Sequence, residues 1–390
     1  MHICEKELCS GCSACRDSCP RNCITMEEDD YGVIYPKIDE FKCVKCNLCK
    51  SICPSINPIN LNNPEECYAA YQTDYETRKN SASGGVAAAL YKVFIATFSG
   101  RIYGVCSENN NVCFKSGNSE EDIEQFKGSQ YTQADMEFVY KSIEEDLVRG
   151  YSVLFIGCPC QVAGCISYVL KKKLNIESLF TVDLLCHGVV PQKYLREELS
   201  YLSNKFNWSE FSKVTFRTNI PGANYHFSLQ YKSDHNTIGQ YRKPAIFSPY
   251  LSSFIFNTSL RTSCYNCKYS TLRRTGDLTI GDFIGLGKKS CYPEYKYKTT
   301  NTSVILVNTQ KGKLLCKSLE SELFMIERPI EEAFTAAPSM NGPAKPSRYR
   351  KKFLKLYPKR GFRRACVKSQ SLLFIKEKTK YIIKKIIKKV

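Results

Sequence analysis

The chain has 390 residues and a formal charge of +18, from 56 Lys and Arg against 38 Asp and Glu. At about 150 residues per domain, this length predicts two or three domains, each large enough to bury a core. A hydrophobic content of 43% with 24% charged residues excludes wholesale disorder. The 22 cysteines are the unusual feature, and they leave disulfides, metal binding and redox chemistry open.

The expected cellular compartment decides between disulfides and the other two alternatives. The first residues begin no apolar signal region, and no later apolar run approaches the roughly 18–20 residues that span a bilayer. We therefore expect a cytoplasmic protein whose thiols stay reduced or bind metal.

Ten of the 22 cysteines precede Pro54, and eight of them form a motif that occurs twice at a spacing of 34 residues. The two copies read Cys9-x2-Cys12-x2-Cys15-x3-Cys19-Pro20 and Cys43-x2-Cys46-x2-Cys49-x3-Cys53-Pro54. In bacterial two-cluster ferredoxins, three thiolates of each run bind one 4Fe-4S cluster and the fourth serves the other cluster. The spacing thus predicts one cluster on Cys9, Cys12, Cys15 and Cys53, and another on Cys43, Cys46, Cys49 and Cys19. Zinc sites or a disulfide framework are the alternatives.

Cys4 and Cys23 lie outside the repeat, and we expect each to be a small buried thiol rather than a ligand. The uncharged, turn-rich stretch from Asn57 to Pro64 predicts a linker. We place the ferredoxin-type domain at 1–60.

The body from 65 to 340 alternates predicted helices and strands, which favours a mixed α/β or α+β sheet domain. Helices are expected from Ser83 to Phe98, over Asp135–Arg149 and over Gln161–Lys172. Strands are expected at Arg101–Ser107, Ser152–Ile156, Leu179–Leu185, Leu278–Ile280 and Ser303–Val307, with a hairpin over Thr215–Tyr231.

A second group of cysteines falls in this body: Cys158, Cys160, Cys186, Cys264 and Cys267. Two of its segments follow predicted strand ends, where sheet proteins place ligands and active sites. Cys160 and Cys186 could complete a four-thiolate site with the Cys264-x2-Cys267 pair. Zinc or a redox dithiol is the alternative, including a strained pair of Cys158 with Cys160.

Three further segments are candidates for ligand contact. Ser83-Gly84-Gly85 at a helix start would let backbone N–H groups approach a phosphate. On these residues alone, an N-cap followed by close packing is the favoured interpretation. Lys127-Gly128-Ser129-Gln130-Tyr131 is a basic, polar turn, and alone it indicates only a loop. The strand from Asp277 to Asp282 either delivers polar groups to a ligand or uses its aspartates to close turns.

The C-terminal residues 345–390 hold most of the charge, with 18 Lys and Arg and a single acid, Glu377. The remaining 344 residues carry 38 basic and 37 acidic residues, or +1. Apolar residues from Leu372 to Val390 recur every three or four positions, with lysines filling the rest. This pattern predicts a basic amphipathic helix suited to an anionic membrane surface, and hence a peripheral membrane protein. A solvated or partner-bound tail is the alternative, and nucleic acid is not an expected partner because the body is nearly neutral.

Taken together, the motifs resemble the coenzyme F420 hydrogenase/dehydrogenase beta-subunit family over about Cys9 to Pro338, with an added ferredoxin-type domain. The resemblance rests on the Ser-Gly-Gly helix start, the Lys-Gly-Ser-x-Tyr segment, the Gly-x-Pro-Cys-Gln turn, the Cys-x-Gly element and the Cys-x2-Cys before Gly-Asp-x-x-x-Gly-Asp. It implies an FAD-binding iron–sulfur flavoprotein, with a third 4Fe-4S cluster on Cys160, Cys186, Cys264 and Cys267. For FAD contacts it implies Ser83, Gly84, Gly85, Lys127, Ser129 and Tyr131.

These inferences predict an oxidoreductase that passes electrons between the 4Fe-4S clusters and FAD. Hydride transfer to or from an organic acceptor would complete the reaction, and the acceptor is either a deazaflavin or a surface-polysaccharide-related substrate. The chain departs from the hydrogenase subunits in its ferredoxin-type domain, its basic tail and Cys158, where they usually carry Thr. Its Cys186-His187-Gly188 and Gly281-Asp282-Phe283 segments resemble bacterial relatives often found with surface-polysaccharide enzymes. His187 is the candidate proton donor, with a structural histidine as the alternative. An electron donor or acceptor protein is the expected partner, and a non-catalytic electron carrier is the alternative function.

Overall fold

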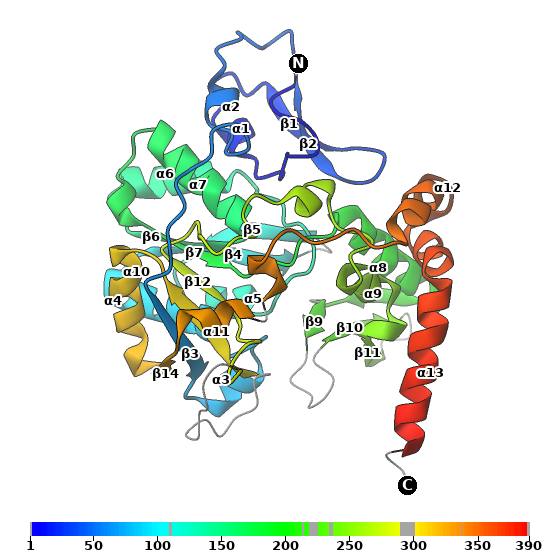
Figure 1. Cartoon of the computed structure of the whole chain (residues 1–390). Coiled ribbons are helices and arrows are strands. Elements are labelled where there is room, and N and C mark those ends of the chain that lie inside the picture. The colour runs from blue at the N-terminus through cyan, green and yellow to red at the C-terminus, as the bar shows by residue number, and fades with distance from the viewer. Residues whose placement is uncertain are drawn as a thin grey trace.

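The computed structural model describes residues 2–108, 111–212, 214–217, 225–233, 237–288, 301–335 and 337–387, with backbone only at 382 and 384–387. A small N-terminal domain sits on a larger body, and the last two helices lie along one side of that body (Figure 1).

The N-terminal domain retains the sequence duplication in its backbone. It contains α1 (Ala14–Asp17), β1 (Ile24–Glu28), β2 (Ile34–Ile38) and α2 (Leu48–Ser51), with β1 and β2 paired antiparallel. Gly11 and Lys45, 34 residues apart, have φ of 68° and 55°, and Ser13 and Asn47 repeat this match at 65° and 60°. The two cysteine loops therefore turn in the same unusual left-handed conformation, which points each run of thiols inward.

The body is built on an eight-stranded sheet with the strand order β14-β3-β13-β12-β7-β6-β4-β5. The adjacent pairs β12–β7, β7–β6 and β6–β4 are parallel, and the other adjacent pairs of the sheet are antiparallel. The strands are β3 (Glu66–Gln72), β4 (Arg101–Glu108), β5 (Asn111–Gly117), β6 (Val153–Gly157), β7 (Leu179–Leu184), β12 (Leu278–Asp282), β13 (Ser303–Val307) and β14 (Leu323–Glu327).

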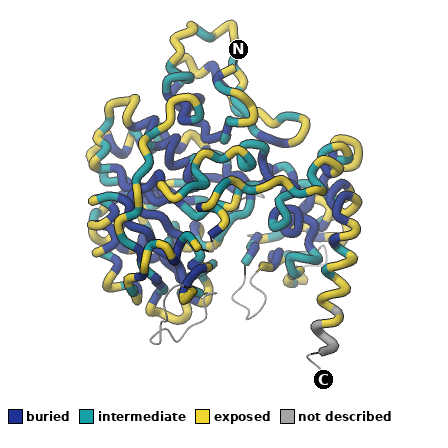
Figure 2. Tube along the Cα trace, in the orientation of Figure 1, coloured by how far each residue is buried: buried dark blue, intermediate teal, exposed yellow. Residues whose placement is uncertain are grey.

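Helices cover both faces of this sheet, so its central strands are buried on both sides (Figure 2). In β6, Val153 and Phe155 pack into one core while Leu154 and Ile156 pack into the other, as the two-residue period of a strand requires. The first core is completed by α6 (Val139–Val148), α7 (Pro159–Lys171), α8 (Gln192–Phe206) and α9 (Pro249–Ile255). The second is completed by α4 (Val86–Phe98), α5 (Glu120–Phe126) and α10 (Gln310–Lys317).

A second, smaller sheet lies beside the body in the order β11-β10-β8, with β9 also paired to β10. Its strands are β8 (Trp208–Phe211), β9 (Thr215–Arg217), β10 (Tyr225–Ser233) and β11 (Ile238–Pro244). The hairpin expected over Thr215–Tyr231 corresponds to the antiparallel pair β9 and β10, and its connection at 218–224 lies outside the described residues. The remaining short elements are α3 (Tyr75–Lys79), η1 (Ile176–Ser178), η2 (Ala245–Phe247), η3 (Thr262–Asn266), η5 (Ser318–Ser321), α11 (Ile330–Thr335) and η6 (Pro338–Met340).

The predicted fold class, a ferredoxin-type domain followed by a larger mixed sheet domain, is confirmed. The apolar runs in the sequence correctly predicted the central strands of the sheet, and β13 has the predicted bounds Ser303–Val307. The edge strands and much of the second sheet carry mixed polar residues, and sequence patterning did not reveal them.

The basic C-terminal segment differs from a single extended tail. The helix α12 (Arg350–Ser369) packs into the body, burying Phe353, Tyr357 and Phe362 fully or nearly so. Its kink at Gly361, with φ 67° and ψ 171°, turns the second half of the helix back onto α8. Only α13 (Ser371–Ile387) projects from the body, and most of its described side chains are exposed (Figure 2).

The Lys and Arg side chains of α12 thus surround an apolar face, which is why charge counting alone suggested a detached tail. Residues 388–390, the end of the predicted amphipathic helix, lie outside the described residues. Within the described part of the chain, no helix combines the length and apolarity needed to cross a bilayer.

Buried polar contacts fix the N-terminal domain to the body. The guanidinium of Arg261, 1% exposed, donates to Cys9 O at 2.8 Å, Ile34 O at 3.1 Å and Gln133 Oε1 at 2.5 Å. Two further bonds join the domains, from Ser167 Oγ to Ile52 O and from Tyr140 N–H to the Asp17 carboxylate.

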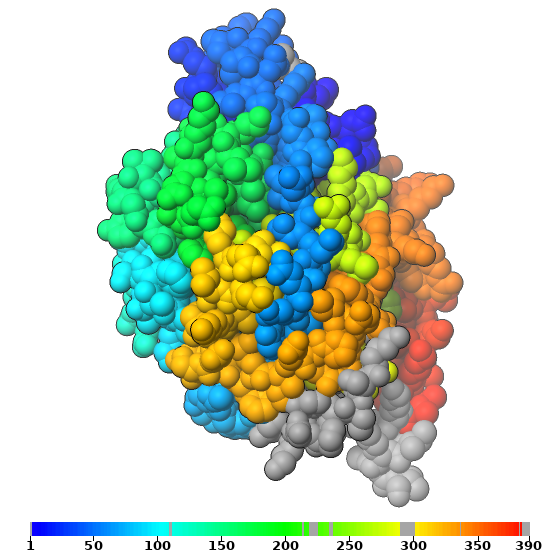
Figure 3. All heavy atoms as spheres, turned by 60° about the vertical axis from the view of Figure 1, so that its left-hand side comes forward, coloured from blue at the N-terminus to red at the C-terminus, as the bar shows by residue number. Residues whose placement is uncertain are grey.

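The segment after the N-terminal domain then runs down the face of the body toward β3 (Figure 3).

Candidate iron–sulfur and ligand site

The eight cysteines of the duplicated motif gather in two groups that mix the two runs. Burial, together with the nearby thiolates of Cys53 and Cys9, raises the pKa of Cys12 to about 12. Burial likewise raises the pKa of Cys49, together with the nearby thiolates of Cys46, Cys19 and Cys43. The structure therefore brings Cys53 to the first run and Cys19 to the second.

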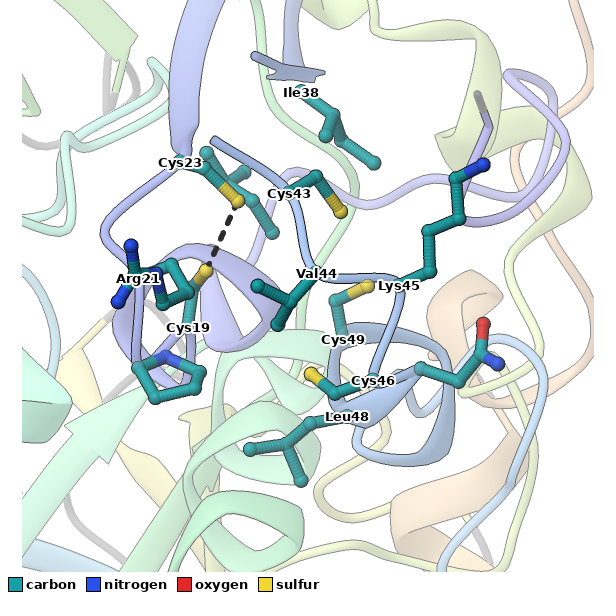
Figure 4. Close-up of a pocket in the computed structure, with 13 residues that line it drawn as sticks. Cys19, Arg21, Cys23, Ile38, Cys43, Val44, Lys45, Cys46, Leu48 and Cys49 are labelled. Carbon is teal, nitrogen blue, oxygen red and sulfur yellow. Dashed lines mark hydrogen bonds between the residues drawn. The ribbon is translucent and has the colours of Figure 1, made fainter. Parts of the chain in front are cut away.

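The two groups differ in exposure. Cys9, Cys12, Cys15 and Cys53 are each 8% exposed and face the body. Cys19, Cys43 and Cys49 are only half-buried, and Cys46 is exposed. In the second group the sulfur atoms gather around one hollow near the surface of the N-terminal domain (Figure 4).

The two cysteines outside the repeat lie beside these groups. A hydrogen bond from Cys4 is the main cause that lowers the pKa of Cys53 to about 6, and Cys4 also contacts Cys9. Cys23 Sγ lies 3.4 Å from Cys19 Sγ. Cys23 is buried and Cys4 half-buried.

The five cysteines of the body also come together. Cys158 and Cys186 follow the carboxyl ends of the neighbouring parallel strands β6 and β7, so their sulfur atoms meet at 3.7 Å. Cys160 is the second residue of α7, and η3 supplies Cys264. Burial raises the pKa of Cys264 to about 12, and the nearby thiolates of Cys186 and Cys267 add to this effect.

Among the described residues, no three Cys, His or acidic side chains are placed to hold a single metal ion. A 4Fe-4S cluster has a different requirement, because each thiolate binds its own iron at a separate corner of a cube. The grouped but separated thiols are of the kind that a cluster uses.

Helix α7 links the buried N-terminal group to the group in the body. Cys160 lies one helical turn before Gly164, and a Cβ at Gly164 would lie 3.1 Å from Cys12 Sγ. Tyr269 lies two residues after Cys267. Burial raises the pKa of its hydroxyl group, and the nearby Cys160 and Cys12 thiolates raise it too. Hence the two groups of thiols are separated by little more than one helical turn and one aromatic ring.

A cavity of about 460 Å³ opens beside the body's cysteines. Five of the six residues predicted to contact a flavin line it, along with Cys158, Cys186 and His187; these five are Ser83, Gly85, Lys127, Ser129 and Tyr131. The sixth, Gly84, packs instead against the sheet: its N–H donates to Ser303 Oγ, and a Cβ there would lie 2.4 Å from Ala70 O. Gly85 has φ of 85°, and it is the N-cap of α4 at the wall of the cavity.

His187 lies at the mouth of this cavity. Its Nε2–H donates to Asn257 Oδ1 at 2.6 Å, and its ring meets Phe254 edge-on at 5.2 Å between centroids. Burial lowers the pKa of His187, partly offset by this hydrogen bond. The imidazole is therefore neutral at pH 7, with Nδ1 as its acceptor.

The lining of the cavity also contains an ion pair that sequence reasoning did not find. Arg217 Nη1 donates to Asp282 Oδ2 at 2.5 Å, and its guanidinium lies 5.3 Å from the Tyr225 ring centroid. Tyr131 stacks on Phe254 with centroids 4.5 Å apart. Among the described residues, Gln130 Oε1 and Arg217 Nε are buried polar atoms that lack a hydrogen-bond partner.

The two aspartates of the Gly-Asp segments have different roles. Asp282 faces the cavity, whereas Asp277 accepts hydrogen bonds from Thr181 and Thr309 and ties β12 to its neighbours. Arg274 is 1% exposed and pairs with the fully buried Asp183 at 2.7 Å. This pair fixes the chain between Cys267 and β12.

Grouped cysteines beside a cavity are the arrangement expected of an iron–sulfur electron-transfer protein. Residues 8–56 match the 4Fe-4S dicluster domain, and residues 150–333 match the C terminus of the coenzyme F420 hydrogenase/dehydrogenase beta subunit. Over residues 150–333 the chain is therefore similar to this beta-subunit family, and residues 8–56 form an N-terminal 4Fe-4S dicluster domain. It is an electron-transferring oxidoreductase that binds 4Fe-4S clusters.

No curated protein matches the chain. Among solved structures, a chain of the xenon-derivatised F420-reducing [NiFe] hydrogenase complex from Methanosarcina barkeri is similar, with 16% identity and a TM-score of 0.43. The alignment covers 80% of the present chain and 92% of that chain.

Proposed function

We propose that the chain is an FAD- and iron–sulfur-dependent oxidoreductase with three 4Fe-4S clusters. Two would lie on the N-terminal cysteines, and the third on Cys160, Cys186, Cys264 and Cys267. The observation that carries this proposal is the shared cavity, because Cys186 and the five predicted flavin contacts line the same space.

The cavity has features that suit a flavin nucleotide. The N-terminus of the 13-residue helix α4 offers unpaired backbone N–H groups, and Gly85 leaves room for a phosphate to approach them. Lys127, which pairs with Glu124, places a cation in the lining of the same cavity. The unpartnered Gln130 Oε1 and Arg217 Nε are an acceptor and a donor of the kind that an isoalloxazine edge or a substrate would complete.

A bound FAD would exchange electrons singly with the clusters and in pairs with an organic compound. Residues that line the cavity would serve both kinds of electron exchange. Cys186 and Cys158 bring the third thiolate group to the cavity wall, and Phe254 with Tyr131 forms an aromatic wall there. His187 Nδ1 is available to hold a proton at the mouth of the cavity.

The organic partner would be a deazaflavin or a surface-polysaccharide-related substrate. The second candidate function is a non-catalytic electron carrier docked to an enzyme. A pure carrier needs no flavin, and a cavity of about 460 Å³ beside the thiolates favours the enzyme.

Anaerobic reconstitution tests the proposal. The wild-type chain should bind about twelve iron atoms and one FAD, at four iron atoms for each cluster. Cys186→Ser should bind about eight, whereas Cys316→Ser, a buried cysteine of α10 outside all groups, should still bind about twelve. Eight iron atoms without flavin in the wild-type protein would contradict both the third cluster and the flavin site.

We also propose that α13 holds the protein at an anionic membrane. Leu372, Ile375 and Ile383 are 50–70% exposed, on a helix that otherwise carries many lysines. At about 1 kcal/mol for each basic residue near such a surface, several lysines suffice for salt-sensitive binding.

Sedimentation with phosphatidylserine vesicles checks this second proposal. The full chain should sediment with the vesicles, and a chain ending at Gln370 should not. Equal binding by the two forms would refute a membrane role for α13.

A further inference from the structure

The second N-terminal cysteine group is the one that opens to solvent. Cys46 is exposed and its hollow reaches the surface, whereas the first group is buried against the body. If both groups hold clusters, as proposed above, an external protein can come close only to the second one. Electron exchange with a partner would then take place at this end of the N-terminal domain.

The loop around this group exposes apolar side chains. Phe41 is fully exposed, at 105% of its reference area, and Val44 is 60% exposed. They flank Cys43, and Cys46 follows two residues after Val44. Exposed aromatic residues beside a redox centre are typical of the centre of a protein–protein interface rather than of a solvated loop.

The charges around this loop are mainly positive. Arg21 and Lys45 lie at the hollow itself, and Lys42 and Lys50 lie on the same segment (Figure 4). The acids of the segment are Asp39, which pairs with Lys42 at 3.4 Å, and Glu40. Four cations against two acids leave a net charge of +2 beside the cysteines.

Two acids of the β1–β2 hairpin, Glu27 and Glu28, are held in ion pairs away from this loop. Glu28, at the end of β1, pairs with Arg196 of α8, and Glu27 pairs with Lys37 at 2.9 Å. The turn between β1 and β2 also contacts the body, since Tyr31 stacks on Tyr357 of α12. Thus Glu28 is bound to the body and Glu27 to a lysine of its own hairpin, while the loop with Phe41 keeps its net positive charge.

We propose that Phe41, Val44, Arg21, Lys42, Lys45 and Lys50 form a docking face for a small acidic electron-carrier protein. The inference rests on the proposed function, because it requires a cluster on Cys43, Cys46, Cys49 and Cys19. Docking would let one electron pass from the reduced carrier to that cluster. The carrier is oxidised by one electron, the cluster is reduced by one, and no bond forms or breaks.

Stopped-flow reduction of the anaerobic holoprotein tests this face, with a plant-type [2Fe-2S] ferredoxin as the acidic carrier. Phe41→Ala and Lys45→Glu should each lower the second-order rate constant about tenfold or more. Leu314→Ala and Lys205→Glu change an exposed Leu of α10 and an exposed Lys of α8, and they should leave the rate constant unchanged. The wild-type rate constant should also fall as ionic strength rises.

Reduction by methyl viologen radical separates the two proposals. This small cation needs no docking face, so all five proteins should be reduced by it at similar rates. Failure of the viologen to bleach the clusters would count against the proposed function instead. Equal ferredoxin rate constants in Phe41→Ala, Lys45→Glu and the controls would overturn the docking face. A wild-type dimer that Phe41→Ala dissociates would also overturn it, by showing that a second copy covers this face.

Discussion

Replacement of Arg261 by Met should loosen the N-terminal domain from the body. Arg261 is buried and donates to three acceptors outside its own segment, Cys9 O, Ile34 O and Gln133 Oε1, and also to the nearby Ser263 Oγ. Met has a similar length and no donor, so all three acceptors would lose their partner. An unsatisfied buried acceptor costs about 1–3 kcal/mol, and partial relaxation places the total near the low end, at about 3–4 kcal/mol.

Anaerobic urea unfolding, followed by the fluorescence of Trp208, measures this loss. Arg273→Met provides the matched control, because Arg273 also reaches the N-terminal segment, at Leu61 O, but is exposed. Its free energy of unfolding should stay within about 0.5 kcal/mol of wild type. Arg261→Met should also be cut faster by protease in the linker at 57–64. Equal stability and equal cleavage in the two variants would refute the reasoning about domain attachment.

Two further predictions concern the C-terminal helices. A chain ending at Gln370 should fold and bind iron like wild type. A chain ending at residue 344 lacks Phe353 and Phe362, which belong to the core, and should be insoluble on expression. Soluble, iron-loaded protein from this shorter form would contradict the packing of α12. Burial raises the pKa of Glu198 from 4.5 to about 7, despite its ion pair with Arg363. A raised carboxyl pKa costs stability as pH rises, so wild type should lose roughly 3 kcal/mol relative to Glu198→Gln between pH 4.5 and 7, with no further change above pH 7. If the free energy of unfolding changed equally with pH in the two proteins over that range, Glu198 would not be the cause of the pH dependence.

Short-range patterns allowed much of the fold to be predicted. The cysteine runs depend on local spacing, and the buried strand Ser303–Val307 depends on a continuous apolar run, so both are legible in the sequence. The packing of α12 could not be predicted from the sequence, because its buried aromatic residues are spread among many lysines and interrupted by Pro358 and Gly361.

The same limit applies to the site. Predicted contacts such as Gly85 and Tyr131 belong to short recognisable segments, and both line the cavity. Arg217 carries no such signal, since its partner Asp282 is 65 residues away and only the fold brings them together. Gly84 illustrates the opposite error, because a glycine beside a ligand segment can serve the packing of the sheet rather than the ligand.

The attachment of the N-terminal domain has a consequence for turnover. Arg261 and Ser167 hold the domain at its base, and the β1–β2 hairpin touches α8 and α12 at its side. A domain held at two places does not swing between a loading and an unloading position, as a carrier on a flexible tether must. Electron delivery inside the molecule would therefore be a tunnelling event over a fixed gap, and its rate should be insensitive to solvent viscosity.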